Sequence, residues 1–307
     1  MMYPAAGVII GLFLAHKGEK ILPAGFFITV LATTGVLIVL ALLSVFLPVN
    51  DLNIAGMTMS VYNLISQYIL IIGSIVALVF LAVAGNEKRA AAGLTRQNWK
   101  SAVLIVLAFV GIYIVRTVVS VAVQGVSDGS GMQHVKEWAA MFKNPMMWLN
   151  IAALPINYFF VFIAFFGEEY GWRYYLQPVL QKRFGLRAGV IILGVVWGLW
   201  HIPDDLFYYT QTSGIQMIFA QQITCISLGI FFAYAYMKTQ NIWVPVCLHY
   251  LNNNLIPIIS GTFSADVLEN QTVSWKDLPV ALVLNGLCFG FFLLADVFKK
   301  KEVQEEE

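Results

Sequence analysis

The chain alternates long apolar runs with short polar connections. A helix needs about 20 apolar residues to cross the hydrocarbon layer of a bilayer, and eight runs reach or approach that length. They are residues 21–48, 58–84, 101–123, 146–180, 187–209, 215–238, 242–260 and 277–298. A further apolar run, residues 3–15, is too short to be a confident span.

These runs are apolar on every face, whereas the strands of a membrane β-barrel alternate apolar and polar positions. We therefore predict an all-α fold, a polytopic helical membrane bundle of about eight transmembrane helices with a short additional N-terminal hydrophobic segment. No linker is long enough to separate two domains, so residues 1–307 are predicted to form a single integral membrane domain.

The composition excludes an ordinary soluble enzyme. Of the 307 residues, 59% are apolar and 11% are charged, whereas a soluble domain contains roughly 25% charged residues. The formal net charge of +1 provides no basic field for nucleic acid, so no nucleic-acid partner is expected and the partners predicted are membrane lipid and substrate. The three cysteines, Cys225, Cys247 and Cys288, lie in apolar runs, which argues against a disulfide framework or a Cys-rich zinc site.

The basic residues between the runs predict the orientation in the membrane. Thirteen of them fall in one alternate set of connections and three in the other, and the richer set is expected in the cytoplasm. The thirteen are Lys17, Lys20, Lys88, Arg89, Arg96, Lys100, Lys182, Arg183, Arg187, Lys238, Lys299, Lys300 and Lys301. The C-terminus is therefore predicted to be cytoplasmic.

The first of three polar clusters inside the runs contains Glu168, Glu169 and Arg173. An ionisable residue within a span costs at least about 2.5 kcal/mol on insertion scales, so its presence suggests a function. On a helix, Glu169 and Arg173 are four residues apart in the order that favours an ion pair. Glu168 is rotated by about 100° from Glu169, so we expect it not to share that partner equally and to be the carboxylate that serves the chemistry.

The other two clusters have the same spacing. Trp197 and His201 share one helical face, and so do His249 and Asn253. Glu168 and His201 each lie fourteen residues from the basic turn that separates their runs, so an antiparallel pair of helices would place them at one depth. We therefore expect a carboxylate, two imidazoles and an amide at about the same level of the membrane.

Three prolines, Pro155, Pro203 and Pro245, lie near these clusters. Proline bends or ends helices, and irregular backbone at membrane depth is tolerated where it lines a cavity. The pattern therefore favours a polar cavity beside the three clusters.

Each polar residue also has a simpler interpretation. A single His or Asn in a membrane usually forms an interhelical hydrogen bond. His16 and His134 lie in polar connections and are expected to be incidental. Arg116 lies about two-thirds along its run, and we expect it to reach toward the interface or to pair with an acid such as Asp204 or Asp205.

The residues are compatible with three chemistries. In the first, a carboxylate and an imidazole activate water while a second imidazole and an amide stabilise the oxyanion. In the second, Glu168, His201 and His249 bind zinc for metal-assisted hydrolysis. In the third, Glu and His form a proton relay for transport, although no inverted repeat is evident. Spacing alone leaves these alternatives open.

The three motifs resemble those of the CPBP intramembrane proteases, the group that includes the type II CAAX prenyl endopeptidases and their bacterial relatives. The matching residues are Glu-Glu-x-x-x-Arg at 168–173, Trp-x-x-x-His at 197–201 and His-x-x-x-Asn at 249–253, in the family's order and within about residues 146–260. Tyr174 departs from the pattern, because many bacterial members have Gly at that position.

The resemblance implies an intramembrane endopeptidase with four catalytic residues. Glu168 and His201 would activate water, while His249 and Asn253 would form the oxyanion hole. Glu169, Arg173 and Trp197 would support them. No cofactor is implied, although zinc is the alternative.

The resemblance leaves the substrate and the biological role open. The expected substrate is a membrane-associated peptide or protein, and the expected location is a bacterial plasma membrane, with several spans. A non-catalytic immunity or scaffold protein is the remaining alternative.

Overall fold

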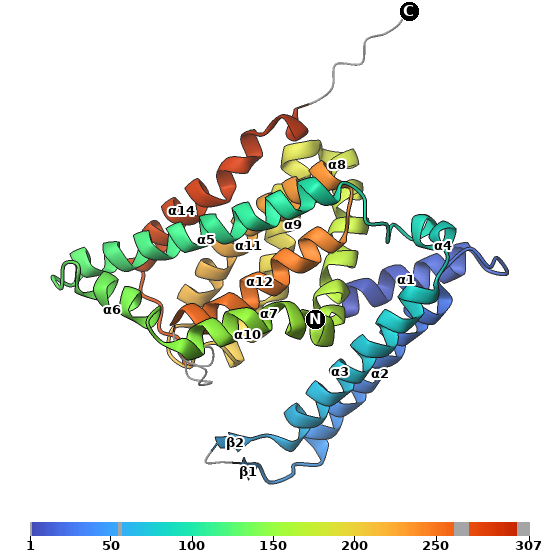
Figure 1. Ribbon diagram of the computed structural model, residues 1–307, viewed down its shortest axis with the longest axis horizontal. Coiled ribbons are helices and arrows are strands. Elements are labelled where there is room, and N and C mark those ends of the chain that lie inside the picture. The colour runs from blue at the N-terminus through green and yellow to red at the C-terminus, as the bar shows by residue number, and fades with distance from the viewer. Residues whose placement is uncertain (1, 55–56, 261–269, 300–307) are drawn as a thin grey trace, which may run out of the picture. The chain divides into compact units, whose positions relative to one another are not determined.

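The computed structural model describes residues 2–54, 57–260 and 270–299 and divides into two compact units (Figure 1). Unit 1 comprises Met1–Arg96 and Ala153–Tyr175, and unit 2 comprises Gln97–Ala152 and Leu176–Glu307. Both units are mainly helical, which confirms the all-α prediction. The single membrane domain stays a prediction, because two compact units can belong to one membrane-embedded bundle. Lys300 and Lys301 of the C-terminal basic cluster lie outside the described residues.

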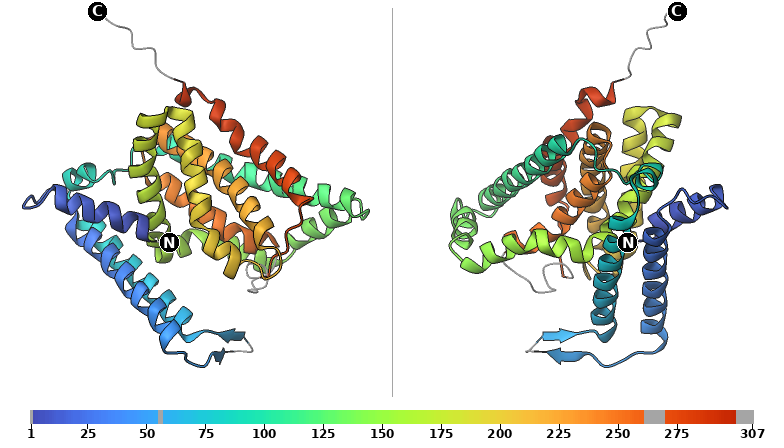
Figure 2. Two further views of the ribbon diagram at one scale, coloured as in Figure 1. Left: turned by 180° about the vertical axis from the view of Figure 1, so that it is seen from behind. Right: turned by 45° about the vertical axis from the view of Figure 1, so that its right-hand side comes forward.

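Unit 1 contains an antiparallel helical hairpin. Helices α2 and α3 lie side by side and are joined by a two-stranded hairpin (Figures 1 and 2). Its elements are α1 (Tyr3–Ala15), α2 (Ala24–Phe46), β1 (Leu52–Ile54), β2 (Met57–Met59), α3 (Val61–Val83), α4 (Asn86–Ala91), the later part of α7 (Pro145–Glu169) and most of the π-helix η1 (Tyr170–Leu176). Pro4 in the first turn of α1 and Pro23 just before α2 suit helix starts, where the missing N–H leaves no intrahelical bond unmade.

Unit 2 contains the remaining helices. They are α5 (Trp99–Ser127), α6 (Gln133–Met141), the first part of α7, α8 (Gln177–Phe184), α9 (Leu186–Trp200), α10 (Ile202–Phe207), α11 (Gly214–Thr239), α12 (Trp243–Ser260), α14 (Asp277–Cys288) and the 3-10 turns η2 (Gly290–Leu294) and η3 (Asp296–Phe298). Gly185, at φ +88°, reverses the chain between α8 and α9. This is the turn that Lys182 and Arg187 marked in the sequence.

Aromatic rings hold the core of unit 2 together. Phe109 of α5 lies 5.5 Å from Phe231 of α11 and 5.6 Å from Phe289, centroid to centroid. All three side chains are at most 1% exposed. Each such pair contributes about 0.5–1.5 kcal/mol beyond the area that it buries, so the cluster joins α5, α11 and the segment after α14.

Six helices among the described residues are long and apolar enough to span a bilayer, so the count of eight is not confirmed. They are Ala24–Phe46, Val61–Val83, Trp99–Ser127, Pro145–Phe184, Leu186–Phe207 and Gly214–Thr239. The run at 277–298 instead forms the 12-residue α14 and two 3-10 turns. Gly286 and Gly290 near that break disfavour a continuous helix by up to about 1 kcal/mol each.

The exposed surface of these helices is apolar. Side chains such as Val39 and Leu42 of α2, Val79 of α3, and Leu104 and Leu107 of α5 are 54–68% exposed. Soluble monomers rarely expose contiguous apolar surface on this scale, whereas a hydrocarbon layer accepts it. The protein is therefore a multi-pass integral membrane protein.

The close packing of α9 on α11 depends on Gly194, and this generates a prediction. A Cβ atom at Gly194 would lie 2.7 Å from the Cα atom of Ile226, a backbone atom that cannot move aside. We expect Gly194→Ala to push the helices apart and lower the stability of the purified protein by about 1–3 kcal/mol, measured by thermal unfolding in detergent.

Gly111→Ala is the matched control, because nothing lies within 4 Å of a Cβ atom there. Its effect should be neutral or stabilising by up to about 1 kcal/mol, since alanine favours a helix over glycine. Equal unfolding temperatures for both variants would contradict the close approach of α9 and α11.

Candidate active site

The first motif lies where α7 changes into the π-helix η1. Glu168 and Glu169 end α7 and are 2% and 0% exposed, and Arg173 in η1 is also 0% exposed. The Nε atom of Arg173 lies 3.1 Å from Oε2 of Glu169. The predicted ion pair is therefore present, and it neutralises two charges that would be costly to bury separately.

The π-helical segment was not predicted. Its wider turn still places residue i+4 near residue i, so the ion pair survives the change, and such segments often occur at functional sites. Tyr170 stacks between Phe166 and Tyr174, with centroid distances of 4.8 and 4.5 Å. The Tyr170 hydroxyl also donates a 2.9 Å hydrogen bond to the carbonyl of Ala92. These contacts fix the segment in unit 1.

The start of the chain packs against this motif, a role that sequence reasoning missed. Cβ atoms at Gly167 and Gly171 would lie 2.7 Å from backbone atoms of Met2 and Pro4, respectively. The signal available in the sequence was the spacing of these two glycines, four residues apart, because small residues at that spacing let helices approach closely.

The second motif lies at a break between helices. Helix α9 ends at Trp200, His201 follows, and α10 begins with Pro203 in its first turn. Pro245 likewise lies in the first turn of a helix, α12, whereas α7 continues through Pro155. Pro203 removes one donor and disfavours continuation of α9.

The hydrogen bond of His201 selects its tautomer. Its Nδ1 atom lies 2.8 Å from the carbonyl oxygen of Trp197. Because a carbonyl can only accept, Nδ1 carries a proton, and in the neutral form of the ring Nε2 holds the lone pair. The sulfur of Cys225 is 3.8 Å from the same Nδ1. The neutral form of His201 can therefore accept a proton at Nε2.

Trp197 contacts both candidate imidazoles. Its ring lies 5.8 Å from His201 and 5.4 Å from His249, edge to face in both cases. Phe232 of α11 lies 6.1 Å from the His249 ring. With Trp197 and His249 only 3% and 2% exposed, these rings limit the rotation of both histidines.

A cavity of about 380 Å³ in unit 2 brings the second and third motifs together. We call it the candidate cavity, and its lining includes Arg116, Trp197, His201, His249, Asn252 and Asn253. Asn252 donates a 3.0 Å hydrogen bond to Oδ1 of Asn253. The acceptor end of the Asn253 amide is thus used, and its NH₂ group is the end that can donate to a ligand.

The structure therefore places the predicted residues in two groups. His201, His249 and Asn253 line one cavity of unit 2, while Glu168 lies in unit 1 beside the Glu169–Arg173 pair.

The expected partners of Arg116 were wrong. Neither Asp204 nor Asp205 forms an ion pair with it in the part of the chain that the structure describes. Its Nε atom instead donates a 2.7 Å hydrogen bond to Oδ1 of Asn285, which is 2% exposed. Sequence spacing could not reveal this contact, because 169 residues separate the two. The lining of the candidate cavity, as described, contains no carboxylate beside Arg116.

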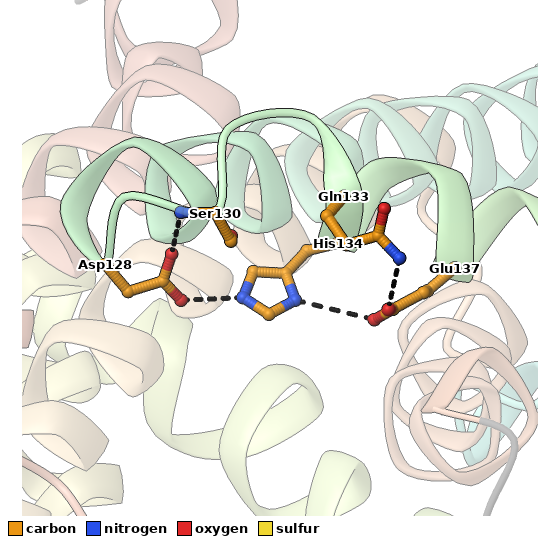
Figure 3. Close-up of polar contacts among 5 residues, drawn as sticks. All are labelled: Asp128, Ser130, Gln133, His134 and Glu137. Atoms are coloured by element: carbon orange, nitrogen blue, oxygen red, sulfur yellow. Dashed lines mark hydrogen bonds and ion pairs between the residues drawn. The ribbon is translucent and has the colours of Figure 1, made fainter.

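The other two histidines lie outside the lining of the candidate cavity, as expected. His16 pairs with Glu19 at 3.1 Å. Figure 3 shows His134 between two carboxylates, 2.6 Å from Asp128 and 3.6 Å from Glu137.

The zinc alternative stays a prediction. Among the described residues, no group of three His, Cys, Asp or Glu side chains is placed to hold a metal ion. The candidate cavity itself provides two imidazoles and the thiol of Cys225, and its other polar side chains are amides, tyrosine and threonine hydroxyls and the Arg116 guanidinium. Catalytic zinc usually has three protein ligands held together, and the described residues show no such group.

Together these features define a class, a multi-pass helical membrane protein with a cavity lined by histidine and asparagine. Residues 150–255 match the family described as type II CAAX prenyl endopeptidase Rce1-like. The resemblance to the CPBP family is thereby confirmed, and the chain contains an Rce1-like region that includes all seven predicted site residues.

A curated relative supports the match. CAAX prenyl protease 2 of Methanococcus maripaludis is 27% identical over 125 residues, which cover 38% of this chain and 45% of that protein. The chain thus matches less than half of the relative's length. No solved structure matches the chain.

The buried Glu169–Arg173 pair generates a stability prediction. Arg173→Met leaves a buried carboxylate without its cation, so we expect a loss of about 3–5 kcal/mol in thermal or denaturant unfolding. The double variant Glu169→Gln/Arg173→Met removes both charges and should be less destabilised than Arg173→Met alone. A double variant that is as unstable as the sum of its single variants would show that the two charges are not coupled.

The cluster in Figure 3 generates a pH prediction. Asp128 raises the pKa of His134 above the ordinary 6.5. The larger cause is the hydrogen bond between the two side chains, and the negative charge of the Asp128 carboxylate adds to it. Hydrogen bonds from Ser130 and then His134 lower the pKa of Asp128 below its ordinary 3.8. The His134 contribution to stability is complete below pH 6.5 and lost as pH rises through the raised pKa, while that of Asp128 is lost as pH falls through the lowered pKa. The contribution of the Asp128–His134 contact to stability is therefore greatest between pH 3.8 and pH 6.5, the ordinary pKa values of the two groups.

An NMR titration of the His134 ring tests the assignment. Asp128→Asn should bring the pKa of His134 back toward 6.5, whereas Glu137→Gln should shift it less, because the Glu137 carboxylate is 1 Å farther away at 3.6 against 2.6 Å. Equal shifts in the two variants would contradict the dominance of Asp128.

Proposed function

We propose that the protein is an intramembrane endopeptidase that hydrolyses peptide bonds of membrane-associated peptides or proteins. The observation that carries the proposal is the pair of imidazoles in the candidate cavity, with Nε2 of His201 available as a base, inside an Rce1-like region. The name of the curated relative, a CAAX prenyl protease, supports peptide hydrolysis as the class of reaction.

In the proposed reaction, Glu168 and His201 activate the water. In the sequence, both residues lie fourteen positions from the basic turn between their helices. As water attacks the scissile carbonyl carbon, its proton passes to this carboxylate–imidazole pair. The same proton then goes to the leaving amine as the C–N bond breaks, so the free acid and the amine are released.

His249 and Asn253 would stabilise the tetrahedral intermediate. The oxyanion needs preorganised donors, and each such donor contributes about 10²–10³ in kcat. The Asn253 amide offers its NH₂ group because its oxygen accepts from Asn252. The aromatic contacts of His249 with Trp197 and Phe232 hold its ring in place before substrate binds.

Glu169 and Arg173 are proposed to position Glu168. Their ion pair fixes the turn at which α7 becomes η1, and Glu168 precedes that turn directly.

We place the protein in a bacterial plasma membrane. The basic residues predict that its C-terminus lies in the cytoplasm.

The decisive experiment compares peptides in cells that express the wild type or Glu168→Gln. Peptide termini found only with the wild type identify substrates, whose cleavage is then measured with purified protein. We expect Glu168→Gln and His201→Asn each to lower kcat by about 10²–10⁴, and Asn253→Ala by about 10²–10³.

Glu137→Gln and His134→Asn are matched controls, because they make the same chemical changes at a solvent-exposed corner. Both should retain wild-type cleavage. Unchanged cleavage by Glu168→Gln would show that Glu168 is not the base. If no peptide terminus depends on the protein and the purified wild type cleaves nothing, the protease proposal fails and a scaffold or immunity role is favoured. Stoichiometric zinc whose chelation abolishes cleavage would instead favour the metal-dependent alternative.

A further inference from the structure

A second cavity, in unit 1, has a polar end and an apolar wall. It has a volume of about 460 Å³ and lies among the ends of α3, α4 and the middle of α7. We call it the arginine pocket. Its polar lining is Asn86, Arg89, Thr95 and Arg96, and its apolar lining is Leu78, Leu81, Ala82, Leu94 and Phe159.

Two arginines give this pocket a positive charge. Arg89 donates a 2.7 Å hydrogen bond from one terminal nitrogen to the carbonyl of Ala82, and its Nε atom is buried with no hydrogen-bond partner among the described residues. Arg96 is exposed. No ion pair joins either arginine to a carboxylate in the described ranges, in contrast to Arg173. The polar end therefore offers N–H donors and uncompensated charge to an anion.

The position of the pocket indicates where that anion comes from. Helix α3 ends at Val83, and the basic residues predict that this end faces the cytoplasm. Nearby side chains such as Val79 and Phe80 are 58% and 43% exposed, as lipid-facing residues are. Phe159 in the pocket wall is 53% exposed as well. The arginines thus lie where the apolar surface of α3 gives way to polar residues, which is the level of lipid headgroups.

We propose that the arginine pocket binds the phosphate of an anionic phospholipid, with the acyl chains along the exposed apolar surface of α3. Guanidinium groups pair with phosphate through two parallel hydrogen bonds, and basic pockets at the cytoplasmic side of membrane helices bind anionic headgroups. The apolar wall favours a lipid over free phosphate, because free phosphate gains nothing from it.

The simpler reading is that both arginines only extend toward water. It predicts no preference among lipids and no difference between Arg96 and its basic neighbours. The contact of Arg89 argues against it, because one of its terminal nitrogens is held at the pocket wall by the hydrogen bond to the carbonyl of Ala82.

The test uses the purified full-length protein in detergent, with native mass spectrometry and thermal unfolding as readouts. Neither readout requires proteolysis, so the result is independent of the proposed function. Dioleoyl phosphatidylglycerol should bind at lower concentration than dioleoyl phosphatidylcholine and raise the unfolding temperature more. Arg96→Gln should weaken phosphatidylglycerol binding about five-fold, the effect of one basic residue at an anionic headgroup.

Lys88→Gln is the matched control. It removes the same charge from the same short helix as Arg89 but does not line the pocket, so it should leave the affinity for phosphatidylglycerol within about two-fold. Arg89→Lys keeps the charge and tests the planar guanidinium, and it should weaken binding without preventing folding. Arg96→Gln removes no hydrogen bond that the structure records, so it tests the site even if Arg89 variants unfold.

Three outcomes would overturn the proposal. Equal loss of binding in Lys88→Gln and Arg96→Gln would show attraction to surface charge alone. Inorganic phosphate that stabilises the protein as well as phosphatidylglycerol at the same concentration would show a site for free phosphate. Wild-type affinity for phosphatidylglycerol in Arg96→Gln would show that the lipid binds elsewhere.

Discussion

The need to satisfy polar groups inside apolar helices determines much of this structure. The clearest case is the ion pair of Glu169 and Arg173, two charges with no exposed surface at a distance of 3.1 Å. Either charge alone would be costly to bury, so the two residues must stay together. That requirement fixes the turn between α7 and η1, and Glu168, the candidate base, takes its position from the same turn. Stability and candidate chemistry thus depend on one contact.

The imidazoles of unit 2 are held by a different means. His201 follows the last residue of α9, where a regular helix would otherwise fix its direction, and its Nδ1 bond to Trp197 replaces that constraint. Trp197 also touches His249, so one large ring positions side chains from two helices. Gly194, one turn earlier on α9, lets the helix lie close against α11. Helix α9 therefore contains both a small residue, Gly194, that lets α11 pack closely and a large one, Trp197, that contacts the two histidines.

The features that could be predicted from the sequence depend on residues that are close together along the chain. Spacing of four residues predicted the ion pair of Glu169 and Arg173, and hydropathy predicted a multi-pass helical protein. The number of spans was less accessible, because the run that ends near Phe298 contains enough apolar residues for a helix but glycines that break it. Contacts between distant segments were not accessible, such as Arg116 with Asn285, because one sequence contains no signal that joins residues so far apart.

The contacts of Arg173 and Arg116 have opposite electrostatic consequences. Arg173 faces a carboxylate, so its motif is neutral overall. Arg116 donates to the neutral amide of Asn285, so its full charge remains beside the candidate cavity. A positive charge beside a cavity favours negative charge that develops nearby. The oxyanion of the proposed reaction would form in that same cavity, and an amide partner, unlike a carboxylate, orients the guanidinium without cancelling its field.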